Sequence, residues 1–217
     1  MSVEIVPTIL TSDNNAYRQI FENYNRFVKR VQIDVCDGVF TPTLTIDVSN
    51  VWWAEGWAKI DLHMMVMNPS SFLPVILKLK PNLVIFHAET NENLLPIFEQ
   101  LKANNIHTGV AILKQTYPGK IAPYIEAADH CLIFAGKLGQ MGGEPDLLQI
   151  EKVPLIKNIS PNIEIGWDGG ANLETIRELA HSGIDVINVG SAIATSPDPA
   201  KAYAALVEES EKGGVRI

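Results

Sequence analysis

The feature of this sequence that most constrains its fold is a regular alternation between two kinds of segment. Short apolar runs, several of them rich in Val and Ile, alternate with longer segments in which apolar residues recur at the spacing of a helix. The pattern occurs eight times from one end of the chain to the other, without a second period. Short strands that alternate with helices predict a parallel sheet joined by right-handed crossovers.

The two kinds of segment give the expected elements. The expected strands are Glu4–Ile9, Val31–Val35, Ile60–Met64, Leu83–His87, His107–Leu113, His130–Phe134, Glu164–Trp167 and Val186–Val189. The expected helices are Asn14–Lys29, Val48–Ala54, Ser71–Leu79, Asn91–Asn104, Ala122–Ala128, Asp146–Ile159, Asn172–Ser182 and Ala200–Glu211. Capping sequences support several of these helices, such as NPSS at 68–71.

The number of units in relation to the chain length indicates the fold class. Eight strand–helix units in 217 residues favour a closed (β/α)8 barrel, the TIM-barrel type of α/β protein, over an open doubly wound sheet. Hydrophobic residues make up 47% of the chain, which contains no low-complexity tract and no Ser/Gly-rich linker. We therefore expect a single domain over residues 1–217.

Charge and cysteine content exclude several classes of function. The net charge of −8 argues against a nucleic-acid surface, which needs clustered Lys and Arg, but allows an anionic small molecule held by backbone N–H groups. Cys36 and Cys131 are the only cysteines, and their spacing is not that of a disulfide framework or zinc knuckle. The sequence shows no signal-type segment and no apolar run of the roughly 18 residues that span a membrane. We expect a cytoplasmic protein without a nucleic-acid or membrane partner.

Polar residues lie where several expected strands end, which is where (β/α)8 barrels carry their active sites. Asp34, His63, His87 and Asp168 lie near the C-terminal ends of four different strands. Taken singly, such a histidine is usually structural, and such an aspartate can cap the next helix. Their coincidence at one end of the barrel indicates a common site. Two facing carboxylates suit proton transfer at opposite faces of a carbon, and an Asp/His/Asp set also suits a divalent transition metal.

The segment VQIDVCDG, residues 31–38, fixes the direction of one of these carboxylates. Successive strand side chains alternate between faces, so Gln32, Asp34 and Cys36 share one face. The two β-branched residues between them face an apolar layer, which directs Asp34 into the barrel. Gln32 is then expected beside it on the same inner face.

Short glycine-containing turns follow the last three expected strands. They contain Gly142 and Gly143, Gly169 and Gly170, and Gly190 with Ser191. Backbone N–H groups in such turns commonly hold phosphate in barrels of this type. Each turn alone is also an ordinary loop signal. We expect the three turns to converge on one anion site.

Six stretches of the chain match a known family in order and spacing. They are PTILTSD, QIDVCDGVFTPTLTI, DLHMMVMNP, IFHAET, IGWDGGAN and INVGSAI. On these stretches the chain resembles the ribulose-phosphate 3-epimerases, from near its first residue to about Glu208. The resemblance implies a ribulose-phosphate-binding barrel, a homo-oligomer, one divalent metal ion (Zn, Fe, Mn or Co) and epimerisation of a phosphorylated ketopentose at C3.

The resemblance also assigns roles to individual residues. Asp34 and Asp168 match the two acid/base carboxylates, which are metal ligands as well, and His63 matches a third ligand. The family's fourth ligand is a histidine, and Gln32 occupies that position here. An amide oxygen is a weaker ligand than imidazole for these ions, so the resemblance leaves the occupancy of the metal site open.

Other positions of the resemblance concern the substrate. Thr8 stands where the family usually has a serine, and Met65 keeps one of the methionines around the reaction centre. Cys36 and Phe134 replace two further methionines, and the turn GKLGQMGGEPD at 136–146 is rebuilt. The substrate-binding residues we expect are Thr8, Met65, His87, Gly142, Gly143, Gly169, Gly170, Gly190 and Ser191.

Three functions are compatible with these residues. The leading hypothesis is an epimerase that interconverts D-ribulose 5-phosphate and D-xylulose 5-phosphate, or a related ketose phosphate, by two-aspartate proton transfer through a metal-stabilised enediolate. The alternative is a non-catalytic phosphosugar-binding barrel that has lost its metal site, as the change at Gln32 and the rebuilt turn allow. A phosphosugar lyase or aldolase is less favoured, because QIDVCD lacks the lysine of the Asp-x-Lys-x-x-Asp pattern of hexulose-phosphate synthases. The segment with Trp52, Trp53 and Trp57 is a candidate for packing or for a subunit interface.

Overall fold

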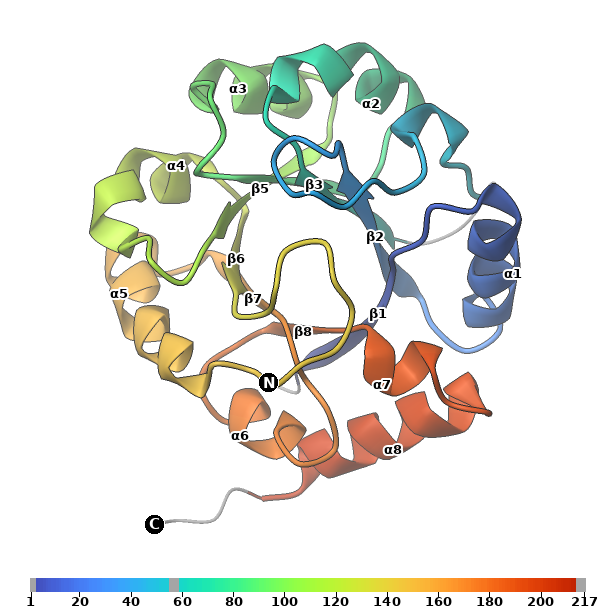
Figure 1. Cartoon of the computed structure of the whole chain (residues 1–217). Coiled ribbons are helices and arrows are strands. Elements are labelled where there is room, and N and C mark those ends of the chain that lie inside the picture. The colour runs from blue at the N-terminus through green and yellow to red at the C-terminus, as the bar shows by residue number, and fades with distance from the viewer. Residues whose placement is uncertain (1–2, 55–58, 214–217) are drawn as a thin grey trace.

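Eight parallel strands close into a barrel in sequence order, as the computed structural model shows for residues 3–54 and 59–213 (Figure 1). The strands are β1 Glu4–Ile9, β2 Arg30–Cys36, β3 Lys59–Met65, β4 Leu83–His87, β5 His107–Ile112, β6 His130–Phe134, β7 Glu164–Asp168 and β8 Val186–Val189. The closing pair is β1 with β8, in which Val6 lies opposite Asn188. The predicted (β/α)8 barrel is confirmed.

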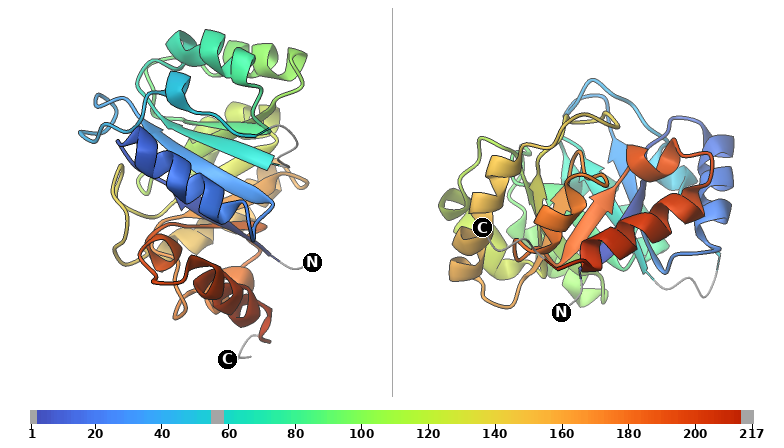
Figure 2. Two further views of the ribbon diagram at one scale, coloured as in Figure 1. Left: turned by 90° about the vertical axis from the view of Figure 1, so that its right-hand side faces the viewer. Right: turned by 90° about the horizontal axis from the view of Figure 1, so that it is seen from below.

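Helices surround the barrel on its outside (Figure 2). They are α1 Asn14–Tyr24, α2 Leu73–Leu79, α3 Leu95–Ala103, α4 Ala122–Ala127, α5 Lys152–Ile159, α6 Ile176–Ala180, α7 Ser191–Ala194 and α8 Pro199–Glu211. Short 3-10 turns at Pro69–Phe72, Pro118–Ile121 and Leu147–Glu151 lead into α2, α4 and α5. None of the helices in the described ranges is long and apolar enough to cross a membrane.

The expected helix over Val48–Ala54 is wrong. Only a 3-10 turn forms, at Val48–Asn50, and the chain is extended at Val51. The carbonyl of Trp52 accepts a hydrogen bond of 2.6 Å from the hydroxyl of Tyr17, which ties this extended segment to α1. Trp57, the remaining tryptophan of the candidate interface, lies outside the described residues.

Several helix boundaries also differ from the sequence expectation. Helix α1 ends at Tyr24 rather than at Lys29, because the chain turns there, with the N–H groups of Phe27 and Val28 both bonded to the Tyr24 carbonyl. Helix α6 is shorter than the expected segment, since the side chain of Asn172 accepts backbone N–H bonds in the turn that precedes it. The short helix α7 was not expected at all.

Two apolar layers hold the barrel together. The larger one lies between the strands and the helices and includes the outward-facing residues Ile33 and Val35 of β2. A smaller cluster of Leu83, Ile85, Ala111 and Leu132 comes from the neighbouring strands β4, β5 and β6. The side chains of this cluster point away from the helices and fill the barrel interior. The cluster lies between a polar group at the strand N-termini and another at the strand C-termini.

The polar end at the strand N-termini is built around one buried guanidinium group. Arg30, only 3% exposed, donates to Asp61 at 2.6 Å, to Glu4 at 2.9 Å and to both carboxylate oxygens of Glu164 at 3.0 and 2.8 Å. The ring of His130 lies 2.7 Å from Glu164. A permanent cation therefore lies among the acids at this end.

Candidate active site

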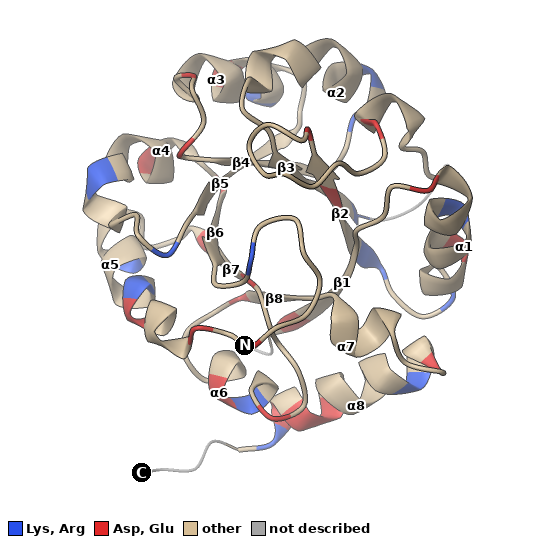
Figure 3. Cartoon of the chain, viewed as in Figure 1, with Lys and Arg blue, Asp and Glu red and all other residues tan. Residues whose placement is uncertain are grey.

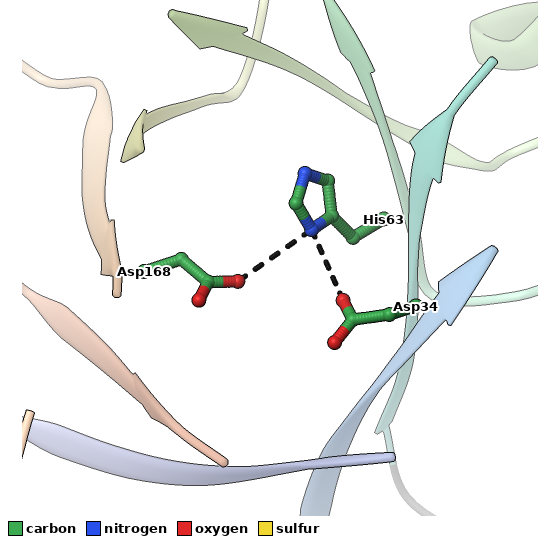
Figure 4. Close-up of side chains that lie close together, drawn as sticks. All are labelled: Asp34, His63 and Asp168. Carbon is green, nitrogen blue, oxygen red and sulfur yellow. Dashed lines mark hydrogen bonds and ion pairs between the residues drawn. The ribbon is translucent and has the colours of Figure 1, made fainter. Parts of the chain in front are cut away.

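The second polar end, at the strand C-termini, brings three of the predicted site residues together (Figure 4). Asp34 and His63 are register neighbours at the ends of β2 and β3, and Asp168 is the last residue of β7. His63 Nδ1 lies 3.0 Å from Asp34 Oδ1 and 3.5 Å from Asp168 Oδ2. His63 is fully buried and Asp34 is 6% exposed. The strand-end positions of these residues are what place them in contact.

Gln32 occupies the middle of this group. Its Nε2 donates to Asp34 Oδ1 at 2.9 Å and to Asp168 Oδ2 at 2.7 Å, and lies 3.5 Å from His63 Nδ1. Its Oε1 is buried and has no hydrogen-bond partner among the described residues. The amide nitrogen of Gln32 is therefore fully hydrogen-bonded, whereas its oxygen has no partner among the described residues.

Each aspartate engages the group through one oxygen and leaves the other available. Asp34 Oδ1 and Asp168 Oδ2 accept from Gln32 and face His63. Within the described part of the chain, neither Asp34 Oδ2 nor Asp168 Oδ1 has a hydrogen-bond partner. Two carboxylates from different strands thus each offer one oxygen to a molecule bound in the mouth.

Burial dominates the electrostatics of the group. Burial raises the pKa of Asp34 to about 6, and the nearby Asp168 acts in the same direction, against the hydrogen bond to His63. Burial alone would lower the pKa of His63, but its hydrogen bonds to Asp168 and Asp34 raise that pKa to about 9. At neutral pH the positively charged partner of these carboxylates is therefore the titratable imidazole of His63, not a permanently charged group.

The donor set fits one divalent metal ion. One ligand atom from each of Asp34, His63 and Asp168 lies within 4.8 Å of the other two. Ligand atoms about 2.0–2.2 Å from a single ion lie within about 4.4 Å of one another, so shifts of a few tenths of an ångström suffice. Two carboxylate oxygens and an imidazole nitrogen suit Zn, Fe, Mn or Co.

His87 lies behind His63, away from the cavity. The two rings face each other with an Nε2–Nε2 separation of 2.9 Å, and His87 is fully buried. Burial lowers the pKa of His87 to about 4, so it stays neutral. On its other side, His87 Nδ1 is 3.6 Å from Glu89, which accepts from Leu113 N–H and the Thr116 hydroxyl. His87, expected to contact the substrate, does not line the cavity in this structure and packs against the ring of His63.

A cavity of about 40 Å³ lies above these residues in the barrel mouth. Its lining contains most of the expected substrate-binding residues, namely Thr8, Met65, Gly142, Gly169, Gly170, Gly190 and Ser191. Gly143 is not part of this lining. The three turns come close together: a Cβ built on Gly142 would lie 3.7 Å from Ser191 Oγ, and one on Gly170 would meet Pro145 N at 2.4 Å.

The β6 loop, residues 136–146, covers the mouth (Figure 1). Thr41 and Thr43, in the loop after β2, donate to the carbonyls of Leu138 and Gly139 at 3.2 and 2.8 Å. Gly139 has φ +66°, and a Cβ there would lie 2.6 Å from Thr43. The covered cavity holds only about three water molecules, so a larger ligand requires this loop to move.

Sequence inspection missed Asn188. This residue of β8 is 3% exposed, lines the cavity and lies opposite Asp168 in the β7–β8 register. Its Oδ1 is buried without a partner in the described ranges. Its position along the strand could have identified it. Asn188 is two residues before Gly190, so both lie on the inner face of the strand.

Comparisons with known proteins agree on one family. The sequence model of the ribulose-phosphate 3 epimerase family matches residues 4–194. The ribulose-phosphate 3-epimerase of Helicobacter pylori strain J99 is 28% identical, over 90% of this chain and 93% of that protein. The cytoplasmic isoform from Oryza sativa is 27% identical, over 97% and 95%. The Mycobacterium bovis protein of the same name is 30% identical, over 86% and 84%.

Comparisons with solved structures give the fold. The 3-hexulose-6-phosphate synthase of Salmonella typhimurium has a TM-score of 0.74 at 16% identity, covering 96% of this chain and 98% of that one. The 3-keto-L-gulonate-6-phosphate decarboxylase of Vibrio cholerae has a TM-score of 0.73 at 14% identity, covering 97% and 98%. At such identities the likeness extends to the (β/α)8 barrel alone.

Proposed function

Because the chain belongs to the ribulose-phosphate 3-epimerase family of isomerases, we propose that it interconverts D-ribulose 5-phosphate and D-xylulose 5-phosphate. The observation that carries this proposal is the pair Asp34 and Asp168, which come from separate strands and each have one oxygen free for substrate. Inversion at a carbon next to a ketone needs such a pair, one group to take the proton and another to return it on the opposite face.

The proposed reaction moves one proton off C3 and another one on. One carboxylate takes the C3 proton, and the electrons of the C–H bond move to the C2 carbonyl oxygen, which gives an enediolate. The other aspartate, protonated at the start, then donates to the opposite face of C3. The raised pKa of Asp34, about 6, lies in the range in which a general acid or base works near neutral pH.

Asp34, His63 and Asp168 would hold the divalent ion that the family resemblance implies. When bound, that ion supplies Lewis-acid stabilisation for negative charge that develops on the substrate oxygens. His87 supports this role, because its Nε2 lies 2.9 Å from His63 Nε2 and keeps His63 Nδ1 turned toward the two carboxylates.

The glycine turns supply the proposed phosphate site. Gly142, Gly170, Gly190 and Ser191 all line one cavity, at its side away from the β2–β3 pair that carries Asp34 and His63. Their backbone N–H groups and the serine hydroxyl suit a phosphate in a chain whose net charge is −8. Most Lys and Arg are interspersed with Asp and Glu around the outer ring of helices, while the β6 loop over the mouth carries Lys137 (Figure 3).

The test is solvent exchange at C3. Purified protein, loaded with Mn²⁺ or Zn²⁺, is incubated with D-ribulose 5-phosphate in D₂O, and the products are followed by NMR. We expect D-xylulose 5-phosphate with deuterium at C3. Tight binding of the sugar phosphate without exchange would contradict epimerase activity and support a phosphosugar-binding barrel. Turnover of a different ketose phosphate with the same labelling would retain the mechanism and change the substrate.

A further inference from the structure

The side chain of Gln32 fills the space between the three metal-ligating atoms. Its Nε2 is 2.9 Å from Asp34 Oδ1, 2.7 Å from Asp168 Oδ2 and 3.5 Å from His63 Nδ1. The residue is buried, with 1% of its surface exposed. An amide N–H₂ group at this place does for the two carboxylates what a cation would do, because it directs two positively polarised hydrogens at them.

This position of the amide and a bound ion exclude each other. An ion shared by the same atoms would lie about 2.0–2.2 Å from each of them, within the space that Nε2 now takes. An amide nitrogen carries two hydrogens and no available lone pair, so it cannot itself become a ligand. Binding of an ion therefore requires the Gln32 amide nitrogen to leave.

The other end of the same amide is an unused acceptor. Gln32 Oε1 is buried and has no partner among the described residues, whereas buried polar atoms are nearly always hydrogen-bonded. A half-turn about the last side-chain torsion exchanges the two ends of the amide, and this torsion is soft in glutamine. After the exchange, a carbonyl oxygen faces the cluster, and once the side chain withdraws by about 2 Å to make room for the ion, such an oxygen can bind it.

We infer that Gln32 is a two-position ligand. With its N–H₂ group inward it bridges Asp34 and Asp168 in the apoprotein, and with Oε1 inward it becomes the fourth protein ligand of the metal. Metal binding then competes with an internal pair of hydrogen bonds. The inference rests on the proposed function only through the identity of the metal ligands. Its test uses metal ions without a sugar phosphate, so the inference and the proposed function can each fail independently.

The first experiment compares metal affinity among variants. Co²⁺ is titrated into EDTA-treated protein, with binding followed by calorimetry and by the visible d–d absorption. Gln32→Leu has a similar length but offers neither a ligand nor a donor, and we expect it to weaken Co²⁺ binding at least about tenfold. Gln32→His, which supplies an imidazole without the competing bridge, should strengthen binding. Unchanged or tighter binding by Gln32→Leu would mean that the amide only obstructs the metal, and would overturn the inference.

The matched control is Gln149, which lies in the 3-10 turn Leu147–Glu151 after the β6 loop and does not line the cavity. Its Nε2 also donates to an aspartate, Asp146, at 3.1 Å, and its Oε1 is likewise buried without a partner in the described ranges. Gln149→Leu should leave Co²⁺ affinity unchanged. A loss equal to that of Gln32→Leu would assign the effect to general destabilisation and would also overturn the inference.

A second measurement on the wild type keeps the inference testable if Gln32→Leu does not fold. Protein labelled with ¹⁵N-glutamine gives one side-chain N–H₂ pair per glutamine, and the Gln32 pair is identified by its absence in Gln32→His. We expect slow hydrogen exchange of this pair in the apoprotein, because both hydrogens are bonded and buried. Saturating Zn²⁺ should shift the pair strongly. Resonances that stay in place with Zn²⁺ bound would show that the amide does not turn.

Discussion

The two ends of the barrel interior contain the same kinds of residue in opposite electrical states. At the N-terminal end, Asp61 and Glu164 are paired with Arg30, whose guanidinium is buried and always charged. At the C-terminal end, Asp34 and Asp168 face a histidine and a neutral amide. The comparison teaches that buried acid alone does not mark a function. A site is indicated where the only cation that the chain offers the buried acids is a titratable imidazole, His63, rather than a permanently charged group.

The largest contrast between the two ends is expected in catalysis. Asp34→Asn and Asp168→Asn should each lower kcat for D-ribulose 5-phosphate by about 10²–10⁴-fold, because each removes a general acid or base. Binding of the sugar phosphate should persist, since the proposed phosphate turns lie elsewhere in the cavity. Asp61→Asn is the matched control, a buried aspartate at the other end, and should lower stability while kcat stays near that of the wild type.

One outcome would contradict the assignment of catalysis to the C-terminal end of the barrel interior. Near wild-type kcat in either Asp34→Asn or Asp168→Asn would remove that residue from the proton-transfer pair. Steady-state rates and calorimetric binding, measured on the same samples, separate lost chemistry from lost binding.

The cation of the N-terminal end should matter for stability. Arg30→Met leaves Asp61, 3% exposed, without its ion-pair partner, and breaking such a buried pair costs about 3 kcal/mol or more of unfolding free energy. We expect the lower end of the known range, because Glu4 and Glu164 are 41% and 37% exposed and can be hydrated. Urea unfolding measures the change. Lys102→Met, which removes an exposed ion pair with Asp129, should change stability by less than about 1 kcal/mol.

The two ends should respond to pH with opposite signs. Burial alone would raise the pKa of Glu164, but hydrogen bonds from His130 and Arg30 hold it well below its usual value. A lowered pKa of an acid gives stability that is present above the unfolded pKa of about 4.3 and is lost as pH falls. The loss of unfolding free energy at acid pH should therefore come from the N-terminal end of the barrel interior.

The alkaline side should report the C-terminal end. The pKa of His63 is raised to about 9. Its stabilisation is fully present below the unfolded pKa of about 6.5 and is lost as pH rises through about 9. The raised pKa of Asp34 acts with the same sign, from about 4 to about 6.

Unfolding free energies of EDTA-treated protein between about pH 2 and pH 10 test both limbs. We expect His63→Asn to flatten the alkaline limb and Glu164→Gln the acid limb. An alkaline limb that is unchanged in His63→Asn would assign it to another group and break the comparison.

The smallest effect concerns the cover over the mouth. Thr41→Val and Thr43→Val each remove one hydrogen bond to the β6 loop, which is worth about 0.5–1.5 kcal/mol. If these bonds hold the closed loop over the substrate, each substitution should raise KM by about two- to tenfold and speed hydrogen exchange in residues 136–146. Faster exchange with unchanged KM would mean that closure does not contribute to substrate binding.

Local patterns explain why so much of the barrel could be predicted. A period-two alternation in the segment around Asp34, and β-branched residues that face the helices, identify both a strand and its inner side. In a closed parallel barrel all strand C-termini meet at one rim. Residues as far apart in the chain as His63 and Asp168 could therefore be assigned to one place without coordinates.

The failures have the opposite cause. The helix expected at Val48–Ala54 is replaced by a short 3-10 turn and an extended stretch whose Trp52 carbonyl accepts a hydrogen bond from Tyr17, a residue distant in sequence. The depth of His87 was likewise not specified by the sequence, since this residue shares the strand phase of a cavity residue and packs against the ring of His63. Strand phase gives a side-chain direction, but depth within the barrel depends on the neighbouring strands.

By itself the sequence determined the eight-unit alternation, the inner face of each strand and the family motifs, because these depend on residues close together along the chain. Only the tertiary structure decided what each inward side chain contacts. Gln32 was visible in the sequence as a departure from histidine, but the position of its amide nitrogen between two carboxylates depends on strands β2 and β7 meeting across the barrel. Hydrogen-bond direction requires distances of about 3 Å, and a linear pattern cannot specify these between residues more than a hundred positions apart.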